Sequence, residues 1–412
     1  MRVAVTVLCI ALCLFLIQAS ARFGFSRMMS RYALATNSVP AAEQAVQPTP
    51  FDPDAHRSRA AILNRMQRSA DAARSLETAT SLRYRDDYLW IELGNTREEL
   101  GDTNGALIAL DQAVRWAPHY AHTHWQRGNL LLRMRRPVDA FAELRQAAAA
   151  NPAYIPSLID LAWGISGGDI KTTEAALAIK DDTTRLALIR YLAQKGKGQE
   201  VADQIRSLTT ALSAEKQIEF ARLLFGGKAY RDAFELWRTA TNNTSSGLIN
   251  GGFEEPIAFN ENTFGWIIAA DQKPHAAIDI SEKFNGAKSL QINLDGSWVP
   301  GTPLLSQTIP VDPNTAYRLS FAVRTKDLVT GGPPVLLVND TDTNQLLGQS
   351  ENLPTATTPW RTINFSFITT ATTQAVIIRL QRNNCESPPC PIFGTLWLDE
   401  FHIEQTEPAN KR

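Results

Sequence analysis

The chain has 412 residues and a formal net charge of −1, from 41 basic and 42 acidic side chains. This balance excludes a protein that binds nucleic acid through a general excess of positive charge. The length exceeds that of one ordinary domain, and 44% of the residues are apolar, so we expect more than one globular domain.

The first 21 residues have the pattern of an export signal. Arg2 precedes an apolar run over 3–17, and Ala19-Ser20-Ala21 supplies the small residues of a cleavage site. The run is shorter than the roughly 17–25 residues of a spanning helix. Apolar residues after Ala21 keep a second interpretation open, an uncleaved membrane tether. In both cases the segment predicts export to the periplasm or cell envelope.

Residues 22–53 are predicted to form a linker. Ala, Pro, Gln and Thr dominate its second half, and prolines at positions 40, 48, 50 and 53 space it out. Such a composition buries little apolar surface, so we expect an extended and mobile chain.

A pattern with a period of 34 residues lies within 54–241. Small residues and a proline recur at this spacing: Gly94, Ala106, Ala113 and Pro118 are repeated as Gly128, Ala140, Ala147 and Pro152. The period is typical of stacked helix-turn-helix units, in which small residues stand where helices approach closely. The clean units are 87–120 and 121–154, with less regular units before and after. We therefore expect an N-terminal all-α solenoid.

Residues at fixed positions of the unit that begins at Asp87 carry a family resemblance. Positions 4, 7, 8, 20, 27 and 32 are Trp90, Leu93, Gly94, Ala106, Ala113 and Pro118. This pattern resembles the tetratricopeptide repeat family, and the second unit departs from it at Arg127, where leucine is usual. The resemblance implies stacked helical hairpins whose inner groove binds a protein or peptide.

The same resemblance implies which residues line that groove. Positions 2, 5, 9, 12 and 13 are Tyr88, Ile91, Asn95, Glu98 and Glu99 in the first unit, and His122, Trp125, Asn129, Leu132 and Arg133 in the second. In peptide-holding members an asparagine at position 9 bonds the ligand backbone as donor and acceptor. Arg133 has the fork geometry to bind a carboxylate, although Ile91 replaces the usual lysine. The alternative, that Asn95 and Asn129 merely face solvent, stays open.

Beyond the turn-rich residues 242–247 the apolar period changes from 3.6 to 2. Alternation is clear over 317–324 and 362–367, and further strand-like runs are separated by Pro, Gly, Asn and Asp. Many short strands with turn signals between them predict an all-β sandwich over 245–406.

Short motifs in this second domain occur in a characteristic order. They are Asn250-Gly251-Gly252-Phe253-Glu254, Gly286-Ala287-Lys288-Ser289-Leu290, Thr358-Pro359-Trp360 and Trp397-Leu398-Asp399-Glu400-Phe401. Their order resembles the jelly-roll carbohydrate-binding modules and their galactose-binding-like relatives. The resemblance implies a structural calcium ion held by Glu254, by the backbone carbonyl of Lys288 and by Asp399.

The position of Asp399 gives separate support for a metal. Simple alternation places this carboxylate on the same face as Trp397, Phe401 and Ile403. An inward carboxylate is costly unless it is paired or metal-bound, and calcium prefers oxygen ligands. Two alternatives stay open: a bulge that turns Asp399 to water, or an arginine partner.

Four side chains of the second domain are candidate sugar contacts. Trp298 lies in a loop pattern over 295–301 and is expected to be exposed for stacking on a sugar ring. Arg324, Arg379 and Gln381 stand at polar positions of their strands, where they would suit sugar hydroxyl groups. The alternative is that they only face water, as polar residues do on most sandwiches.

Cys385 and Cys390 are the only cysteines outside the first 21 residues. In an oxidising compartment a local disulfide is the simplest interpretation. Two cysteines alone supply too few ligands for a structural zinc site.

Motifs of the common enzyme classes are missing from the sequence. It contains no H-E-x-x-H, G-x-S-x-G, phosphate-loop or dinucleotide-binding motif. Our hypothesis is a non-catalytic exported adaptor, whose solenoid binds a protein partner and whose sandwich contacts a polysaccharide. One alternative is an assembly factor in which both domains bind only protein. A glycan-processing enzyme is the third, because Glu254-Glu255 and Asp399-Glu400 are paired carboxylates.

Overall fold

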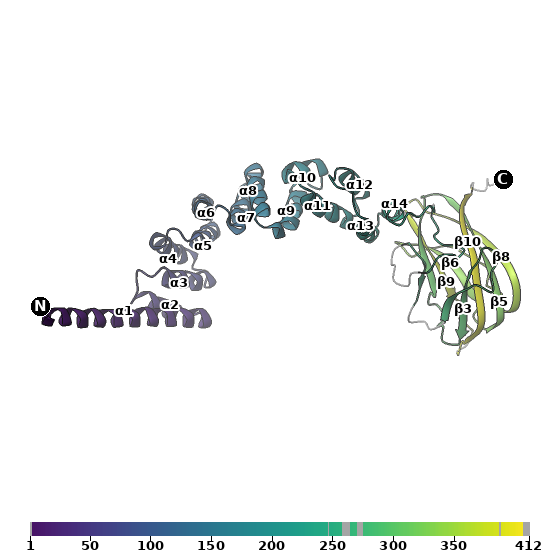
Figure 1. Ribbon diagram of the computed structural model, residues 1–412, viewed down its shortest axis with the longest axis horizontal. Coiled ribbons are helices and arrows are strands. Elements are labelled where there is room, and N and C mark those ends of the chain that lie inside the picture. Colours follow the sequence, from purple (N-terminus) through teal and green to yellow (C-terminus); the bar gives the residue numbers. More distant parts are fainter. Residues whose placement is uncertain (1, 246, 258–263, 270–274, 387–388, 407–412) are drawn as a thin grey trace. The chain divides into compact units, whose positions relative to one another are not determined.

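The computed structural model describes residues 2–245, 247–257, 264–269, 275–386 and 389–406 (Figure 1). The chain forms two compact units, Met1–Thr184 and Arg185–Arg412. We call them unit 1 and unit 2 and describe each by itself.

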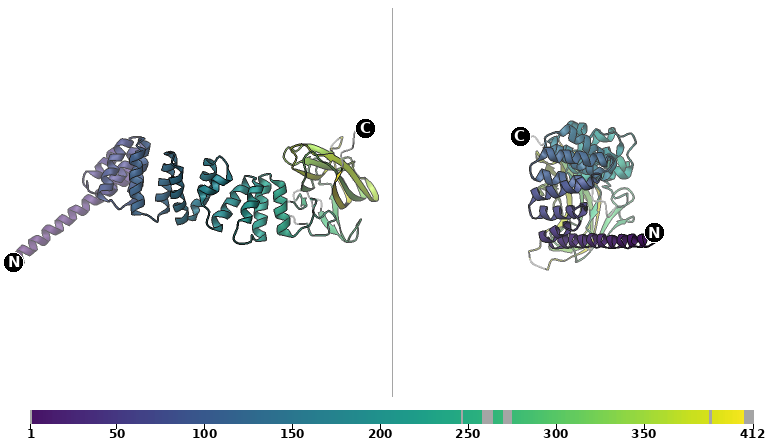
Figure 2. Two further views of the ribbon diagram at one scale, coloured as in Figure 1. Left: turned by 90° about the horizontal axis from the view of Figure 1, so that it is seen from above. Right: turned by 90° about the vertical axis from the view of Figure 1, so that its left-hand side faces the viewer.

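Unit 1 is helical. Its elements are α1 (Arg2–Thr36), α2 (Val39–Val46), α3 (Pro53–Arg65), α4 (Ser69–Leu82), α5 (Asp87–Glu99), α6 (Thr103–Trp116), α7 (Ala121–Arg133), α8 (Pro137–Ala150), the 3-10 turn η1 (Pro152–Tyr154), α9 (Ile155–Ile165) and α10 (Ile170–Leu177). In Figure 2 these helices stack side by side as hairpins. The two clean repeats are the pairs α5–α6 and α7–α8, so the predicted solenoid is confirmed.

The small residues of the repeat stand where the paired helices touch. A Cβ atom on Gly94 would lie 2.9 Å from Leu110 Cγ, and one on Gly128 would lie 2.7 Å from Leu144 Cγ. The repeated alanines are fully buried: Ala106, Ala113, Ala140 and Ala147. The 34-residue period therefore records the close approach of the helices within each hairpin.

The departure from the repeat at Arg127 has a structural reason. Its guanidinium joins two neighbouring helices, through Nε to Asp111 Oδ1 of α6 at 2.7 Å and through Nη1 to Glu143 Oε1 of α8 at 2.6 Å. Glu143 also bonds the buried His124 side chain, with 2.7 Å between Oε2 and Nδ1. Polar contacts thus replace the usual leucine at this position.

The prediction of a mobile linker over 22–53 is wrong. Residues 25–36 of α1 pack against α2 and α3, where Ala33, Ala42 and Ile62 share a buried cluster. Thr49 Oγ1 donates to Ser26 Oγ at 2.8 Å in this interior. Pro40 and Pro53, two of the prolines that suggested an open chain, occupy the first turns of α2 and α3 instead, where proline is tolerated.

The N-terminal half of α1 differs from the half that packs. Its apolar side chains are exposed over Val5–Ile17, and this half extends away from the other helices of unit 1 (Figure 2). By length and composition alone, α1 is long and apolar enough to cross a membrane.

Unit 2 combines helices with a β-sandwich. Its helices are α11 (Asp182–Gln194, which begins just before the unit border), α12 (Gly198–Arg206), α13 (Ala214–Gly226) and α14 (Tyr230–Thr241). Its strands are β1 (Ile267–Ile268), β2 (His275–Asp279), β3 (Ser289–Asp295), β4 (Leu305–Pro310), β5 (Ala316–Thr330), β6 (Pro334–Asp340), β7 (Leu346–Gln349), β8 (Ala356–Ile368), β9 (Ala375–Arg382) and β10 (Ile392–Thr406).

The strands form two antiparallel sheets, in the orders β1-β4-β9-β6-β7 and β2-β3-β10-β5-β8. Alternate residues of their strands build one buried core: Leu290, Ile292, Leu319, Phe321, Val323, Val376, Ile378, Leu380, Leu396 and Leu398. The predicted all-β sandwich is confirmed, because the period of 2 places these residues on the inner faces.

The last two helices pack directly on the sandwich. Phe264 is fully buried, and its ring centroid lies 5.3 Å from that of Phe225 and 5.1 Å from that of Phe234. Tyr230 donates its hydroxyl to Asp342 Oδ1 at 2.7 Å. Burial and this bond raise the pKa of Tyr230. The last helix ends at Thr241 and the first strand begins at Ile267, while the packing unit starts earlier, at Arg185.

Candidate functional site

Aromatic side chains line the first helices of the two clean repeats. The hydroxyl oxygens of Tyr88 and Tyr120 lie 2.7 Å apart, and the ring centroids of Tyr88 and His122 are 6.4 Å apart. Trp125 packs against Tyr154 at a centroid distance of 4.7 Å. Tyr88 is 46% exposed, so the row is open to a ligand. Sequence analysis missed Tyr120 and Tyr154, although their spacing is again 34 residues.

Asn95 and Asn129 occupy equivalent half-buried positions on α5 and α7. Within the described residues neither side-chain amide has a hydrogen-bond partner. Both amides therefore keep their donors and acceptor free for a ligand backbone. A cavity of about 230 Å³ opens beside Asn95 and is also lined by Asn64 and Glu99. Asn64 Oδ1 is buried there without a partner.

Arg133 is already engaged within the chain. Its Nη2 donates to Glu98 Oε2 at 2.7 Å, and its Nε bonds the other carboxylate oxygen of Glu98. A ligand carboxylate at Arg133 would therefore have to displace this surface ion pair with Glu98 of the preceding repeat. The same spacing of 35 positions pairs Arg57 with Glu92, with Nη2 and Oε1 2.6 Å apart.

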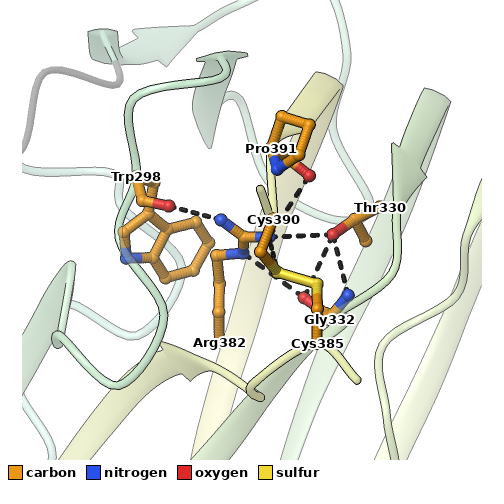
Figure 3. Close-up of a disulfide and its surroundings, with 7 residues drawn as sticks. All are labelled: Trp298, Thr330, Gly332, Arg382, Cys385, Cys390 and Pro391. Atoms are coloured by element: carbon orange, nitrogen blue, oxygen red, sulfur yellow. Dashed lines mark hydrogen bonds between the residues drawn. A yellow bond between two sulfur atoms is a disulfide. The ribbon is translucent and has the colours of Figure 1, made fainter. Parts of the chain in front are cut away.

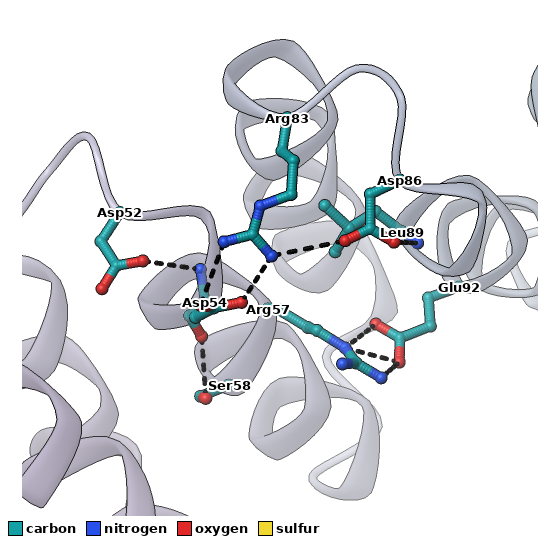
Figure 4. A network of polar contacts seen from close by, with 8 residues as sticks. All are labelled: Asp52, Asp54, Arg57, Ser58, Arg83, Asp86, Leu89 and Glu92. Carbon is teal, nitrogen blue, oxygen red and sulfur yellow. Dashed lines mark hydrogen bonds and ion pairs between the residues drawn. The ribbon is translucent and has the colours of Figure 1, made fainter. Parts of the chain in front are cut away.

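Figure 4 shows the pair of Arg57 and Glu92 beside a second network of polar contacts in unit 1. Arg83 Nη1 donates to Asp54 Oδ1 at 2.9 Å and approaches Asp86 Oδ2 at 3.4 Å. The bond from Arg83 lowers the pKa of Asp54. Successive hairpins are therefore joined by ion pairs on their surface.

Trp298 is not a surface residue. Its side chain is 1% exposed and belongs to the sandwich core. Its indole Nε1 donates to Thr302 O at 3.0 Å, so the polar edge of the ring is satisfied internally. The prediction of an exposed stacking ring is wrong, because the loop folds this side chain inward.

The structure brings together two of the three predicted polar sugar contacts. Arg379 and Gln381 point outward from β9, the central strand of one sheet. Ser306 and Leu337 flank Arg379 in register on the neighbouring strands. Arg379 Nη1 donates to Asn344 Oδ1 at 2.6 Å, and burial lowers the pKa of Arg379. The result is a strip of polar groups beside an apolar side chain.

Arg324 lies on the other sheet, in β5. It forms an ion pair with Glu282, and its guanidinium carbon lies 5.6 Å from the ring centroid of Trp397. It therefore belongs to a different face from Arg379 and Gln381. On that face sequence analysis missed an aromatic pair, Phe284 and Trp360, whose ring centroids are 5.9 Å apart.

Asp399 is fully buried, but not as simple alternation predicted. The pairing of β10 with β5 shifts register between Asp399 and His402, and Glu400 has a φ of 51°. This bulge leaves Asp399 on the side of Trp397 and turns Phe401 into the core. The segment after Ile280, which includes Phe284 and Asn285, covers Asp399 and shields it from water.

Backbone donors satisfy the Asp399 carboxylate. Oδ2 accepts from the N–H groups of Phe284 and Asn285 at 2.9 and 3.2 Å, and Oδ1 accepts from Glu400 N at 2.8 Å. Burial raises the pKa of Asp399, against the opposing effect of these bonds.

Glu254 approaches the same loop from the start of the domain. Its Oε1 accepts from Ala287 N at 2.7 Å and Lys288 N at 3.2 Å, and Lys288 Nζ bonds the backbone oxygen of Glu254. A Cβ atom on Gly252 would lie 3.5 Å from Glu400 Oε1 and 3.8 Å from Asp399 Oδ1. Carboxylate oxygens such as these are the kind of ligand that calcium prefers. Among the described residues, no three His, Cys, Asp or Glu side chains form a metal-holding group.

Cys385 and Cys390 form the predicted disulfide, which lies against a buried arginine (Figure 3). Arg382 is fully buried and donates through Nη2 to Thr330 Oγ1 at 2.9 Å and to Cys390 Sγ at 3.2 Å. Its Nη1 bonds the backbone oxygen of Trp298. Burial lowers the pKa of Arg382. Sequence analysis missed this residue, which continues the inward positions of β9.

The comparison with known families concerns the β-sandwich. Residues 245–387 match the family model described as "Carbohydrate binding domain". No curated protein matches this sequence.

Similar solved structures include both kinds of domain. PilF of Pseudomonas aeruginosa is 18% identical, with 52% of this chain and 97% of that chain covered and a TM-score of 0.34. YrrB, described as a TPR protein with an unusual peptide-binding site, is 15% identical, with 50% and 94% covered and a TM-score of 0.27. TmCBM61, solved with beta-1,4-galactotriose, is 17% identical, with 39% and 100% covered and a TM-score of 0.27. By the family model, residues 245–387 are similar to the family of carbohydrate binding domains.

Proposed function

We propose that the protein is a non-catalytic, exported adaptor that couples a polypeptide partner to a polysaccharide of the cell envelope. The match of residues 245–387 to a carbohydrate binding domain carries the proposal. The same chain carries a helical repeat whose inner surface keeps the side-chain amides of Asn95 and Asn129 available.

The polypeptide would lie along the first helices of the clean repeats. Asn95 and Asn129 are one repeat apart, and their free amides suit the donors and acceptors of an extended backbone. The aromatic row of Tyr88, His122 and Trp125 would contact its side chains. Since Arg133 is paired with Glu98, binding would depend on these amides and rings rather than on a carboxylate clamp.

The polysaccharide would contact the outer face of the sheet centred on β9. Arg379 and Gln381 supply hydrogen-bonding groups there, and the apolar surface of Leu337 lies next to Arg379 in register. Sugar rings present hydroxyl edges and apolar faces, so this mixture of groups suits them.

The proposal also includes export of the chain and a structural calcium ion. Export is supported by the apolar start of α1 and by the disulfide, which persists in oxidising compartments. Residues 25–36 pack as part of the solenoid, which also suits a tether that continues directly into the folded domain.

The proposed calcium ion would stabilise the sandwich. Glu254, the carbonyl of Lys288 and Asp399 would hold the ion, which would neutralise a buried carboxylate and tie residues 284–288 to β10.

One observation favours the alternative of a protein-only assembly factor. Trp298, the ring expected to stack on sugar, is buried. If the sandwich never contacts a glycan, the outer face of β9 would be an ordinary solvated surface.

A glycan array probed with the full chain tests the proposal. We expect binding to at least one polysaccharide, with loss in the double variant Arg379→Ala and Gln381→Ala. Arg324→Ala, on the opposite sheet, is the matched control and should bind as the wild type does. Absence of binding to every glycan on the array would favour the protein-only alternative.

The polypeptide site is tested by affinity capture from native envelopes. Asn95→Ala combined with Asn129→Ala should reduce recovery of the protein partner. Ser81→Ala, on the exposed surface of α4, is the control. Recovery that is equal in all three proteins would remove the groove from the proposal.

A further inference from the structure

A second groove lies in unit 1, outside the row of first helices. It has a volume of about 620 Å³ and is bounded by α8, by the start of α9, by the turn after α10 and by the first turn of α11. Its floor is apolar and includes Ile155, Leu158 and Leu177, which are all buried. Every lining residue falls within 142–184, so the groove belongs to one compact unit.

The groove exists because α10 is short. The corresponding second helices of the clean repeats, α6 and α8, each have 14 residues, whereas α10 has 8. Ala178 then takes a left-handed conformation with a φ of 47° and turns the chain away. At 1.5 Å per residue, the shortfall corresponds to about 9 Å of helix. That length of helix would otherwise cover the neighbouring surface of α8.

The uncovered face of α8 is suited to another helix. Ala142, Gln146 and Ala149 are exposed and follow one another at spacings of four and three residues, so they share one face. Small side chains on such a face allow the backbone of a second helix to approach closely, as Gly94 and Gly128 do within the hairpins.

The charges at the groove favour an acidic ligand. Lys180 has no hydrogen-bond partner within the described part of the chain, and Arg145 uses one donor, Nη1, on Ala176 O at 2.7 Å. The acidic lining residue, Asp181, is occupied, because its carboxylate accepts from Thr184 N at 2.8 Å. Arg145 and Lys180 therefore outnumber Asp181 among the charged lining residues, and the lining carries a net positive charge.

We infer that this groove binds a short amphipathic helix of a partner protein, with a small apolar face and acidic flanking residues. The helix would fill the space left by the shortened α10. Asn95 and Asn129 are not part of this surface, so the inference does not depend on the function proposed above.

Two synthetic 14-residue helical peptides test the inference. Both carry an Ala/Leu face, and one has Glu where the other has Lys at the flanking positions. Fluorescence anisotropy with the full chain should show binding of the Glu peptide in preference to the Lys peptide. Lys180→Glu should reverse this preference, because it changes the sign of one flanking charge.

A steric block completes the test. Ala149→Trp should weaken binding of the Glu peptide by roughly tenfold, because the indole fills the groove. Ala175→Trp, exposed on α10 and outside the lining, should leave binding unchanged. Circular dichroism establishes that each variant is folded. Absence of Glu-peptide binding, equal binding of both peptides, or binding unaffected by Ala149→Trp would overturn the inference.

Discussion

Arginine side chains are used in opposite ways in the helical repeats and in the sandwich. Arg57 and Arg133 lie on the surface of unit 1 and pair with glutamates 35 positions away. Arg382 is enclosed in the sandwich and bonds carbonyl, hydroxyl and sulfur groups. Surface pairs contribute little because water competes for them, whereas a buried cation must keep every partner. We therefore expect the sandwich to depend on few polar groups and the repeats on many weak contacts.

Loss of Arg382 is expected to have the largest effect. Arg382→Ala leaves the buried oxygens of Trp298 and Gly332 without their donor and opens a cavity, at a cost of about 3 kcal/mol or more. Urea unfolding followed by tryptophan fluorescence measures the change. Arg379→Ala, on the outer face of the same strand, should cost less than about 0.5 kcal/mol. Equal losses in the two variants would break the comparison.

Calcium tests a second buried charge of the sandwich. If the ion is held at Asp399, removing it with a chelator should lower the melting temperature of the full chain. At a calcium concentration of 100 times Kd, the loss corresponds to about 2.7 kcal/mol. Asp399→Asn should abolish the response to calcium. A wild-type melting temperature that does not change with chelator would show that the bonds to residues 284, 285 and 400 suffice.

The disulfide should contribute about 2 kcal/mol, as estimated from the entropy of closing so short a loop. We expect dithiothreitol to lower the urea midpoint of the wild type. The double variant Cys385→Ser and Cys390→Ser should show the lower midpoint with or without reductant. A wild-type urea midpoint that does not change with dithiothreitol would mean that Arg382 holds residues 385–390 in place without the disulfide.

A glycine exchange tests the contacts within a hairpin. Gly128→Ala brings a methyl group within 2.7 Å of Leu144 Cγ and should destabilise unit 1 by about 1–2 kcal/mol. Gly164→Ala, in α9, meets no atom within 4 Å and should stabilise the helix by roughly 0.5 kcal/mol. Thermal unfolding followed by circular dichroism compares them. Shifts of the same sign would contradict this account of the repeat.

The smallest effect is expected for a surface pair. A double-mutant cycle with Glu98→Gln and Arg133→Gln should give a coupling energy below about 1 kcal/mol. The coupling should fall further in 1 M salt, because both side chains are in contact with solvent, with exposed fractions of 54% for Arg133 and 23% for Glu98. A coupling as large as the cost of Arg382→Ala would remove the distinction between the two regions.

Much of the fold could be predicted from local pattern. The 34-residue spacing of Gly94 and Gly128 indicated the hairpins, because close helix packing permits few residue types at those positions. Alternation of period 2 over 317–324 indicated the sandwich for a similar reason. The linker prediction failed because alanine and proline are common both in open chains and in the first turns of helices. Only the burial of Ala33 and Ser26 distinguishes the two cases.

The candidate sites were less predictable. Asn95 and Asn129 could be identified because the repeat fixes their place on the first helices. Trp298, Asp399 and Arg382 could not be placed, because a folded loop, a bulge and a neighbouring strand decide where these side chains point.

The sequence by itself therefore determined the two kinds of fold, the helix register and the disulfide pair. Each depends on residues that are close together or regularly spaced in the chain. The tertiary structure alone decided which charges are satisfied and which faces stay open. The partners of Arg133, Arg382 and Asp399 come from other repeats, strands or loops, so only folding brings them within hydrogen-bonding distance.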